Sequence, residues 1–271
     1  MKPIVHDQPA VAPPTFSHWP ACPPPVRIPL TQLGGHPCPY LPGREACDRA
    51  FLADTLPPRL YHGLMDRGFR RSGKVIYQPT CRGCRACVPV RVRVDDFVPN
   101  KSHRRCLKRN ADLSISETSL LPDEEKFELY QRYQRGRHGD TGHLDWQSFV
   151  DFLYDSPIDT REFCYRDADG RLVAVGICDV CSASVSSVYF YYDPAELRRG
   201  LGTFGVLQEI EYCRREGIGY YYLGFWIEGC RAMAYKVNFR PYETLGYDGV
   251  WRDQIAQFDP AAPPDPGSDA P

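Results

Sequence analysis

The sequence lacks any apolar run near the roughly 20 residues that a membrane-spanning helix needs. Its opening stretch, MKPIVHDQPAVAPPTF, also lacks the apolar core of a secretory signal. We therefore expect a cytoplasmic protein with no membrane partner, in which thiols stay mostly reduced. The chain has 12 cysteines, and clusters among them then indicate metal ligands or reactive groups before they indicate disulfides.

The chain also has little net charge, a formal −1 at pH 7, which argues against attraction of polyanions by overall charge. The charge is nevertheless unevenly placed. Residues 67–109 hold thirteen Lys and Arg side chains against two acids, and Phe69, Tyr77 and Phe97 lie among them. Such a segment is typical of a surface that contacts nucleic-acid phosphates, although a solvated basic surface is the alternative.

No repeat period is visible, but the residue composition changes along the chain. Twelve prolines fall within the first 42 residues, which is too many interrupted amides for regular structure. We predict disordered Pro-rich tails at 1–35 and 253–271. Between them we expect a Cys/Arg-rich N-terminal domain at 36–115 and a larger C-terminal domain at 116–252.

The order of elements indicates an α+β fold. In the N-terminal region we expect a helix over 48–67 and short strands at 75–77 and 88–94. Later, the runs EFCYR, RLVAVGICDV and SSVYFYYDP predict three antiparallel strands, and Asp193 and Pro194 then open a helical segment. A strand at GYYYLGF and a further helix complete an order typical of a GNAT-like acyltransferase core.

The run CRGCRAC carries three cysteines at a strict spacing of three: Cys81, Cys84 and Cys87. A tetrahedral metal or an iron–sulfur cluster needs about four thiolates, so a fourth must come from elsewhere. Cys38, in the proline-flanked turn HPCPY, is our candidate, with Cys47 and Cys106 as less constrained competitors. The alternative is that these cysteines are small packed residues without a ligand.

Five motifs follow one another along the chain. They are CPYLPGR at 38–44, GFRRSGKVIYQPTCRGCRACVPVRV at 68–92, SVYFYYDP at 187–194, LGT at 201–203 and YLGFWIEGCRAMAYKVNFRP at 222–241. In this combination the chain resembles the aminoacyl-tRNA–protein transferases of the N-degron pathway, which comprise eukaryotic arginyl-transferases and bacterial leucyl-transferases (Bpt). The resemblance covers most of residues 36–250.

The resemblance implies an enzyme that moves an amino acid from charged tRNA to the α-amino group of proteins beginning with Asp or Glu, marking them for degradation. It implies a GNAT-like catalytic domain preceded by a smaller cysteine-bearing domain, and no cofactor is required for the chemistry. In the arginyl branch the N-terminal cysteines are associated with an iron–sulfur cluster or metal such as zinc. The matching residues here are Cys38, Cys81, Cys84 and Cys87, although Leu41 stands where that branch has a second cysteine.

The donor amino acid is expected to be leucine, because CPYLPGR and CRGCRACVPVRV resemble the leucyl branch. Arginine is the alternative, since SSVYFYYDP is closer to the arginyl branch and CSASV departs from the usual leucyl turn. Trp226, beside Phe225, is expected to line an apolar pocket for the aminoacyl side chain. Glu228 is the nearby acid that would serve an arginyl donor.

An aminoacyl ester is already activated, so the enzyme must position a neutral amine and manage protons. For the proton acceptor we select Asp193, with Asp179 second; an ordinary helix N-cap is the other reading of Asp193. Tyr189, Tyr235 and Lys236 are candidates for hydrogen bonding to the intermediate or the ribose.

Arginine is the residue best suited to recognise an acidic first residue, because its guanidinium forms bidentate hydrogen bonds with carboxylates. Our candidates for this role are Arg71, Arg104 and Arg105, with tRNA phosphate contact as the other reading of each. For tRNA binding we select Gly200 and Gly202 of LRRGLGTFG, whose amides can approach a phosphate, together with Arg82 and Arg85.

Two further functions stay open at this point. One is a GNAT acetyltransferase that uses acetyl-CoA, because the loop at 197–205 resembles the coenzyme A loop of those enzymes, although Leu197 stands where that motif begins with Arg or Gln. The other is a non-catalytic RNA-binding or redox module built on the Cys/Arg region.

Overall fold

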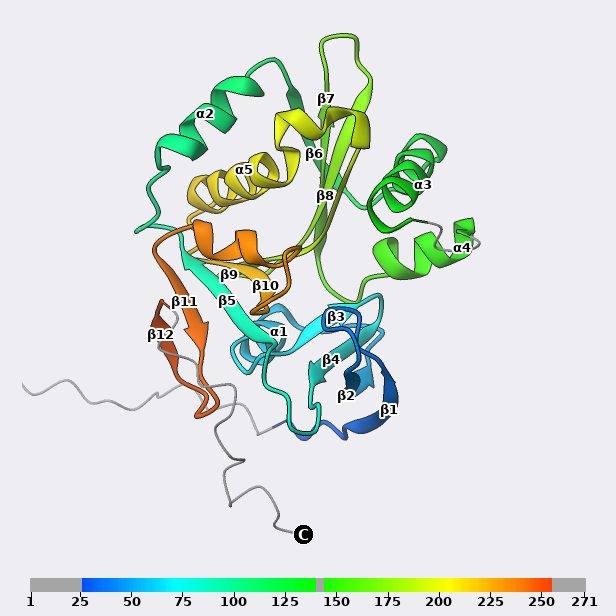
Figure 1. Ribbon diagram of the computed structural model, residues 1–271, viewed down its shortest axis with the longest axis vertical. Helices are drawn as coiled ribbons and strands as arrows, with labels where there is room; N and C mark the ends of the chain where they lie inside the picture. Colours follow the sequence, from blue (N-terminus) through cyan, green and yellow to red (C-terminus); the bar gives the residue numbers. More distant parts are fainter. Residues whose placement is uncertain (1–25, 140–143, 255–271) are drawn as a thin grey trace, which may run out of the picture.

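The computed structural model describes residues 26–139 and 144–254. Two sheets form its framework, a four-stranded sheet in the order β1-β2-β4-β3 and an eight-stranded sheet in the order β12-β11-β5-β10-β9-β8-β7-β6. Figure 1 shows the smaller sheet, together with α1, at one end of the larger one. The smaller sheet and its helix comprise β1 (Thr31–Pro37), β2 (Glu45–Leu52), α1 (Pro58–Met65), β3 (Arg70–Ser72) and β4 (Val75–Pro79).

The larger sheet carries most of the helices. Its strands are β5 (Val88–Arg93), β6 (Ser114–Ser119), β7 (Thr160–Arg166), β8 (Leu172–Val180), β9 (Ser184–Tyr192), β10 (Tyr220–Trp226), β11 (Tyr242–Leu245) and β12 (Trp251–Asp253). The helical segments are α2 (Lys101–Arg109), α3 (Glu124–His138), α4 (Trp146–Phe149), η1 (Val150–Tyr154), η2 (Pro194–Arg199), α5 (Leu201–Arg215) and η3 (Ala234–Asn238). Within the described residues, no helix is both long and apolar enough to cross a bilayer.

The antiparallel run β7, β8 and β9 confirms the predicted meander. The helix predicted over 48–67 is wrong in its first half, where β2 pairs with both β1 and β4. Only Pro58–Met65 is helical, with proline in the first turn. Pairing with two strands distant in sequence decides the conformation of β2, and a local pattern does not register such partners.

The predicted domain limits need correction. Strand β1 begins at Thr31, inside the predicted tail at 1–35, because β2 gives it a pairing partner. Residues 1–25 and 255–271 lie outside the described residues. The predicted N-terminal domain at 36–115 is also divided between the sheets, since β5 pairs with β10 and β11 of the larger sheet. The N-terminal half therefore supplies an interior strand, β5, to the larger sheet.

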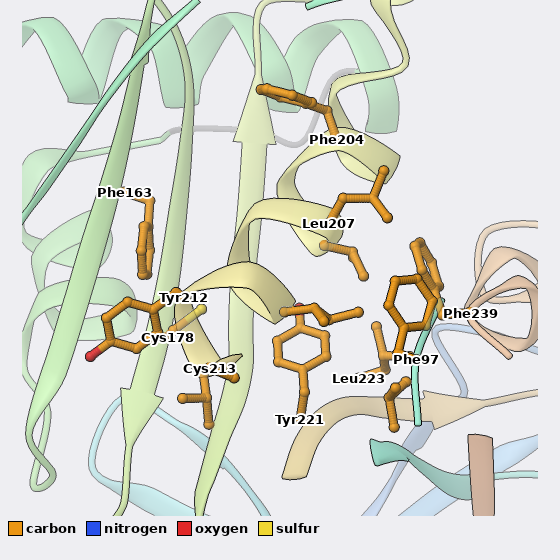
Figure 2. Close-up of a cluster of buried hydrophobic side chains, with 14 of the residues drawn as sticks. Phe97, Phe163, Cys178, Phe204, Leu207, Tyr212, Cys213, Tyr221, Leu223 and Phe239 are labelled. Atoms are coloured by element: carbon orange, nitrogen blue, oxygen red, sulfur yellow. The ribbon is translucent and has the colours of Figure 1, made fainter. Parts of the chain in front are cut away.

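The main core lies between α5 and the larger sheet. Figure 2 shows Phe204, Leu207 and Cys213 of α5 packed with Tyr221 and Leu223 of β10. A second cluster, which includes Phe127, Leu129 and Tyr130, packs α3 against β8 and β9. Helices thus cover both faces of the sheet.

Strands β9 and β10 are parallel neighbours that separate. They pair only where Tyr220, Tyr221 and Tyr222 meet Ser184, Val185 and Ser186, although both strands continue. On its other side, β10 changes register against β5 between Tyr222 and Gly224. Gly224 has φ of 87°, a conformation that favours glycine. Two diverging parallel strands with a helix on their connection give the GNAT-like arrangement, and the space at their ends is the place for a site.

Candidate active site at the diverging strands

Two cavities lie near the divergence of β9 and β10. The first, which we call the thiol cavity, has a volume of about 320 Å³. The second, which we call the polar cavity, has a volume of about 370 Å³. The lining of the thiol cavity includes Cys38, Cys81, Cys84, Cys87, Tyr77 and Phe225. The polar cavity is lined by Asn100, Ser102, His103, Thr203, Tyr235, Asn238, Phe239 and Arg240.

The short helix η3 lines the polar cavity through Tyr235 and Asn238. Lys236, between them in sequence, is buried and donates from Nζ to the carbonyl of Phe225 at 2.9 Å. Phe225 lines the thiol cavity, so Lys236 connects η3 to a wall of that cavity. In Figure 1 this segment is the orange coil that follows β10. Tyr235 and Lys236, both selected from the sequence, therefore lie at the centre of the site.

Lys236 is buried, with 7% of its surface exposed. Burial, and then the charge of Arg70, lower the pKa of the Lys236 ammonium to about 7. A Cβ placed on Gly224 would stand 3.2 Å from Lys236 Nζ and 4.0 Å from Arg70 Nε. The glycine at the strand irregularity thus leaves a small space flanked by two cations.

Arg70, which the sequence analysis did not select, is 5% exposed. Its Nε and Nη2 atoms are buried and have no hydrogen-bond partner among the described residues. The guanidinium lies over the rings of Tyr222 and Phe225, 5.2 Å and 5.8 Å from their centroids. Burial lowers the pKa of Arg70.

Arg71 and Asp179, predicted as a substrate contact and a second proton acceptor, bind each other instead. Arg71 Nε and Nη2 both donate to the Asp179 carboxylate, at 2.7 to 2.9 Å, and Thr160 Oγ1 donates to it at 2.8 Å. Asp179 is fully buried. A carboxylate with all of these donors is a structural partner of Arg71, so neither residue is placed to meet a substrate.

Asp193, the first-choice proton acceptor, has the N-cap role that was the alternative reading. Its Oδ1 accepts from the amide of Ala195 at 3.0 Å, at the start of η2. Its Oδ2 is 3.0 Å from Arg171 Nη1 and 3.8 Å from Arg132 Nε. The carboxylate lines neither cavity. Capping and ion pairing account for its position.

Three other selected residues also lie away from both cavities. Tyr189 accepts a hydrogen bond from Gln134 at 2.8 Å within the cluster under α3. Trp226 points to the face of β10 opposite Phe225 and packs against the main core. Glu228 is exposed in the turn after β10.

The predicted basic surface is concentrated on α2, which packs beside α5. Arg104 and Arg105 are exposed there, and the helix holds no acid. Asn100 and His103 of the same segment line the polar cavity, where His103 stacks on Phe239 at 5.1 Å. The exposed cations of the helix are Lys101, Arg104, Arg105, Lys108 and Arg109. This arrangement presents positive charge beside a polar cavity.

Gly200 and Gly202, the two glycines selected for tRNA binding, differ in backbone conformation and surroundings. Gly200 has φ of 69° and joins η2 to α5, so the predicted single helix is broken there. A Cβ on Gly202 would meet nothing within 4 Å, so close packing does not require glycine at this position. Thr203, one residue on, lines the polar cavity. Arg82 is exposed in the cysteine turn, and Arg85 lies over the ring of Tyr247 at 4.4 Å.

The four selected cysteines come together around the thiol cavity, and thiolates are ligands that suit zinc or an iron–sulfur cluster. Burial raises the pKa of the Cys87 thiol to about 12. Cys81 Sγ accepts from the amide of Cys47 at 3.4 Å. Across residues 26–139 and 144–254, no three His, Cys, Asp or Glu side chains converge as ligands of one ion. The side chains in this conformation do not form a ready metal site, and the cofactor prediction stays a prediction.

Glu209 of α5 is a buried acid that the sequence analysis missed. Burial raises the pKa of its carboxyl to about 7, and the hydroxyl of Tyr221 donates to Oε2. Its position on an apolar helix face was visible in the sequence as a polar interruption. Arg70 and Arg71 are neighbours in β3 and point to opposite faces, but no strand was predicted at 70–72, so the sequence did not separate their roles.

Comparisons with known proteins agree on one family. Residues 36–105 match the model of the N terminus of arginine-tRNA-protein transferase, and residues 125–246 match the model of its C terminus. A protein named aspartate/glutamate leucyltransferase from Teredinibacter turnerae is 42% identical over 78% of this chain and 88% of its own. A protein of the same name from Parvibaculum lavamentivorans is 43% identical over 80% of this chain and 90% of its own.

Solved structures share a more distant likeness. The C-terminal domain of a putative lysylphosphatidylglycerol synthetase from Agrobacterium fabrum matches 74% of this chain and 69% of its own, with 17% identity and a TM-score of 0.45. A GCN5-related N-acetyltransferase from Kribbella flavida matches 62% of this chain and 54% of its own, with 16% identity and a TM-score of 0.30.

Proposed function

The chain belongs to the arginine-tRNA-protein transferase family, and on that premise we propose that it transfers leucine from charged tRNA to proteins whose first residue is Asp or Glu. The transfer of an aminoacyl group from tRNA to a protein N-terminus follows from the family and the relatives. Leucine as donor and an acidic acceptor are the finer part of the proposal. They are supported by relatives of about 40% identity that are named aspartate/glutamate leucyltransferases.

One observation supports the proposal on the structural side: η3 lines the polar cavity through Tyr235, and its Lys236 donates to the carbonyl of Phe225, which lines the thiol cavity. A transferase that joins a tRNA-bound group to a protein needs two entrances that meet. We assign the polar cavity to the 3′ end of the tRNA. Its hydrogen-bonding lining and the neighbouring cations of α2 suit a ribose and phosphates. The thiol cavity then receives the first residue of the acceptor protein.

The reaction needs positioning more than it needs a strong base. The acceptor nitrogen attacks the ester carbonyl carbon, a C–N bond forms, and the bond from that carbon to the ribose oxygen breaks. The nitrogen loses a proton and the departing ribose oxygen gains one. In this proposal Tyr235, on the polar-cavity side of η3, hydrogen bonds to the ribose.

A leucyl donor agrees with what lies beside the polar cavity. Phe239, which lines that cavity, gives it an apolar surface. Glu228, the acid considered for an arginyl donor, lies exposed outside both cavities. A metal or cluster at the thiol cavity would stiffen the cysteine turn, and no step of the reaction depends on it.

The test is transfer of radiolabelled amino acid to peptides beginning with Asp, Glu, Lys or Ala. Leucyl-tRNA and arginyl-tRNA are used in parallel, with protein purified anaerobically. We expect labelling of the Asp and Glu peptides from leucyl-tRNA alone. Labelling from arginyl-tRNA instead would identify arginine, and not leucine, as the donor amino acid. Labelling from neither, with acetyl transfer from acetyl-CoA instead, would overturn the proposal.

A further inference from the structure

Among the residues that the structure describes, the buried Lys and Arg side chains are neutralised with two exceptions. Arg71 is paired with Asp179, Arg91 with Glu243 and Asp66, and Lys126 with Glu162, each through an N to O distance of 2.5 to 2.7 Å. Within the described residues, Arg70 and Lys236 form no ion pair with a carboxylate. An unpaired buried charge costs several kcal/mol, on the order of the penalty for removing one partner of a buried ion pair. Two such charges side by side need a reason.

The two exceptions are neighbours. They approach from different parts of the chain, Arg70 from the edge strand β3 and Lys236 from η3, and meet at Gly224. Lys236 Nζ and Arg70 Nε are both within 4.0 Å of the position that a Cβ on residue 224 would take. Any side chain at residue 224 would occupy that position. The strand irregularity and the glycine therefore keep open a space that positive groups flank.

The unsatisfied atoms of Arg70 indicate what the space is for. Nε and Nη2 are two adjacent donors of one planar guanidinium, and both lack acceptors within the described chain. Adjacent guanidinium donors match the two oxygens of a carboxylate. Lys236 Nζ has three donors, of which one reaches the carbonyl of Phe225. A single carboxylate can accept a hydrogen bond from each of these three nitrogen atoms, Arg70 Nε, Arg70 Nη2 and Lys236 Nζ.

The space lies beside the thiol cavity. Phe225 lines that cavity, lies under the Arg70 guanidinium and accepts from Lys236 through its carbonyl. Tyr77, a second lining residue, is the cross-strand neighbour of Arg70 in the smaller sheet. A group that enters the thiol cavity and passes Phe225 therefore meets the cation pair.

From this geometry we infer that Arg70 and Lys236 bind the side-chain carboxylate of the acceptor's first residue, and so determine that Asp and Glu are chosen. The inference rests on the proposed function and names the residues that give it acceptor specificity. It replaces Arg71, which is saturated by Asp179, and moves the role one residue along the same strand. A carboxylate bound there offsets one of the two unpaired charges that the free protein carries.

The test compares pentapeptides that differ in one group. One peptide begins with Asp and the other with Asn, which has the same shape without the charge, and both have amidated C-termini. Binding to the full chain is measured by calorimetry without tRNA, and transfer is measured with leucyl-tRNA. For the wild-type protein we expect the Asp peptide to bind tighter than the Asn peptide by about 10- to 100-fold, the contribution of charge-assisted hydrogen bonds.

In Arg70→Gln and in Lys236→Met, the Asp to Asn ratio should fall by about tenfold or more in both assays. Arg67→Gln, which removes an exposed arginine of the same segment, is the matched control and should keep the ratio. Circular dichroism and thermal melting of each variant establish that it is folded. If one variant is unfolded, the other carries the test. Arg70→Lys, which retains the charge without the paired donors, should give an intermediate ratio.

The outcomes separate this inference from the proposed function. If the wild-type protein transfers leucine but both variants keep its Asp to Asn ratio, the cation pair is not the specificity site. If the wild-type protein binds the two peptides equally, the inference is also overturned. If it prefers the Asp peptide, loses that preference in both variants and yet transfers no amino acid, the carboxylate site stands and the proposed reaction fails.

Discussion

The pair formed by Arg71 and Asp179 offers the sharpest test of whether Asp179 has a structural role, which the structure indicates, or acts as a proton acceptor. Removing the negative charge through Asp179→Asn leaves Arg71 buried without a counter-charge. The carboxylate is fully buried and receives three hydrogen bonds from Arg71 and one from Thr160. Breaking one side of a buried pair costs about 3 to 5 kcal/mol. We therefore expect a large loss of stability whatever happens to activity.

The size of the expected shift can be measured. For a chain of this length, 1 kcal/mol corresponds to a change in Tm of about 2 to 4 °C, so Asp179→Asn should lower the Tm by about 6 to 20 °C. Urea unfolding followed by tryptophan fluorescence gives the free energy directly. Asp159→Asn is the control, because Asp159 is exposed and its ion pair with Arg161 spans 3.6 Å. That change should cost no more than about 1 kcal/mol.

A double variant completes the test. Arg71→Met with Asp179→Leu removes both charges and should recover much of the lost stability, since apolar replacement of a buried pair is often neutral. It should also retain transfer activity below its melting temperature. The structural reading would be refuted if Asp179→Asn kept wild-type stability and lost transfer, because Asp179 would then act in the chemistry.

Four further predictions follow from other parts of the molecule. Lys236→Met should be stabilised relative to the wild type most strongly near pH 7, and the difference should shrink towards pH 10. The pKa of Lys236 is about 7 in the folded state, below the unfolded value of about 10.5. Between these values the folded state binds fewer protons than the unfolded state, so the wild type gains stability as pH rises. Urea titrations at pH 7, 8.5 and 10 measure the difference in free energy of unfolding between the two proteins, and a difference that stays constant with pH would contradict the prediction. Replacing Arg104 and Arg105 by Ala should make the slope of log K for tRNA binding against log salt shallower by about 1.8, at about 0.9 per phosphate contact, while Arg161→Ala should leave the slope unchanged. Gly224→Ala should cost about 1 to 2 kcal/mol in unfolding experiments because φ is 87°, and it should raise KM for an Asp peptide by displacing Lys236; unchanged KM would count against the carboxylate site. Cys81→Ser should lower the metal or iron content of anaerobically purified protein together with its activity, and unchanged metal content and activity would remove the case for a metal.

Much of the fold could be predicted because its signals are local. The strands of the meander alternate or run apolar, and α3 has Asp123 as its N-cap and two acids in its first turn. The family motifs identified Tyr235, which lines the polar cavity, and Lys236, which donates to the carbonyl of Phe225. The limits of the N-terminal domain could not be predicted, since β5 reads as a strand without revealing that its partners are β10 and β11.

The sequence by itself determined the reaction class, the antiparallel meander and the adjacency of Arg70 and Arg71. Alternation along β3 makes these two side chains point to opposite faces. Only the tertiary structure decided their roles. Asp179, 108 residues away, folds back to neutralise Arg71, whereas Lys236 arrives beside Arg70 and adds a second positive charge. Charge compensation depends on which side chains meet through space, and spacing along the chain does not carry that information.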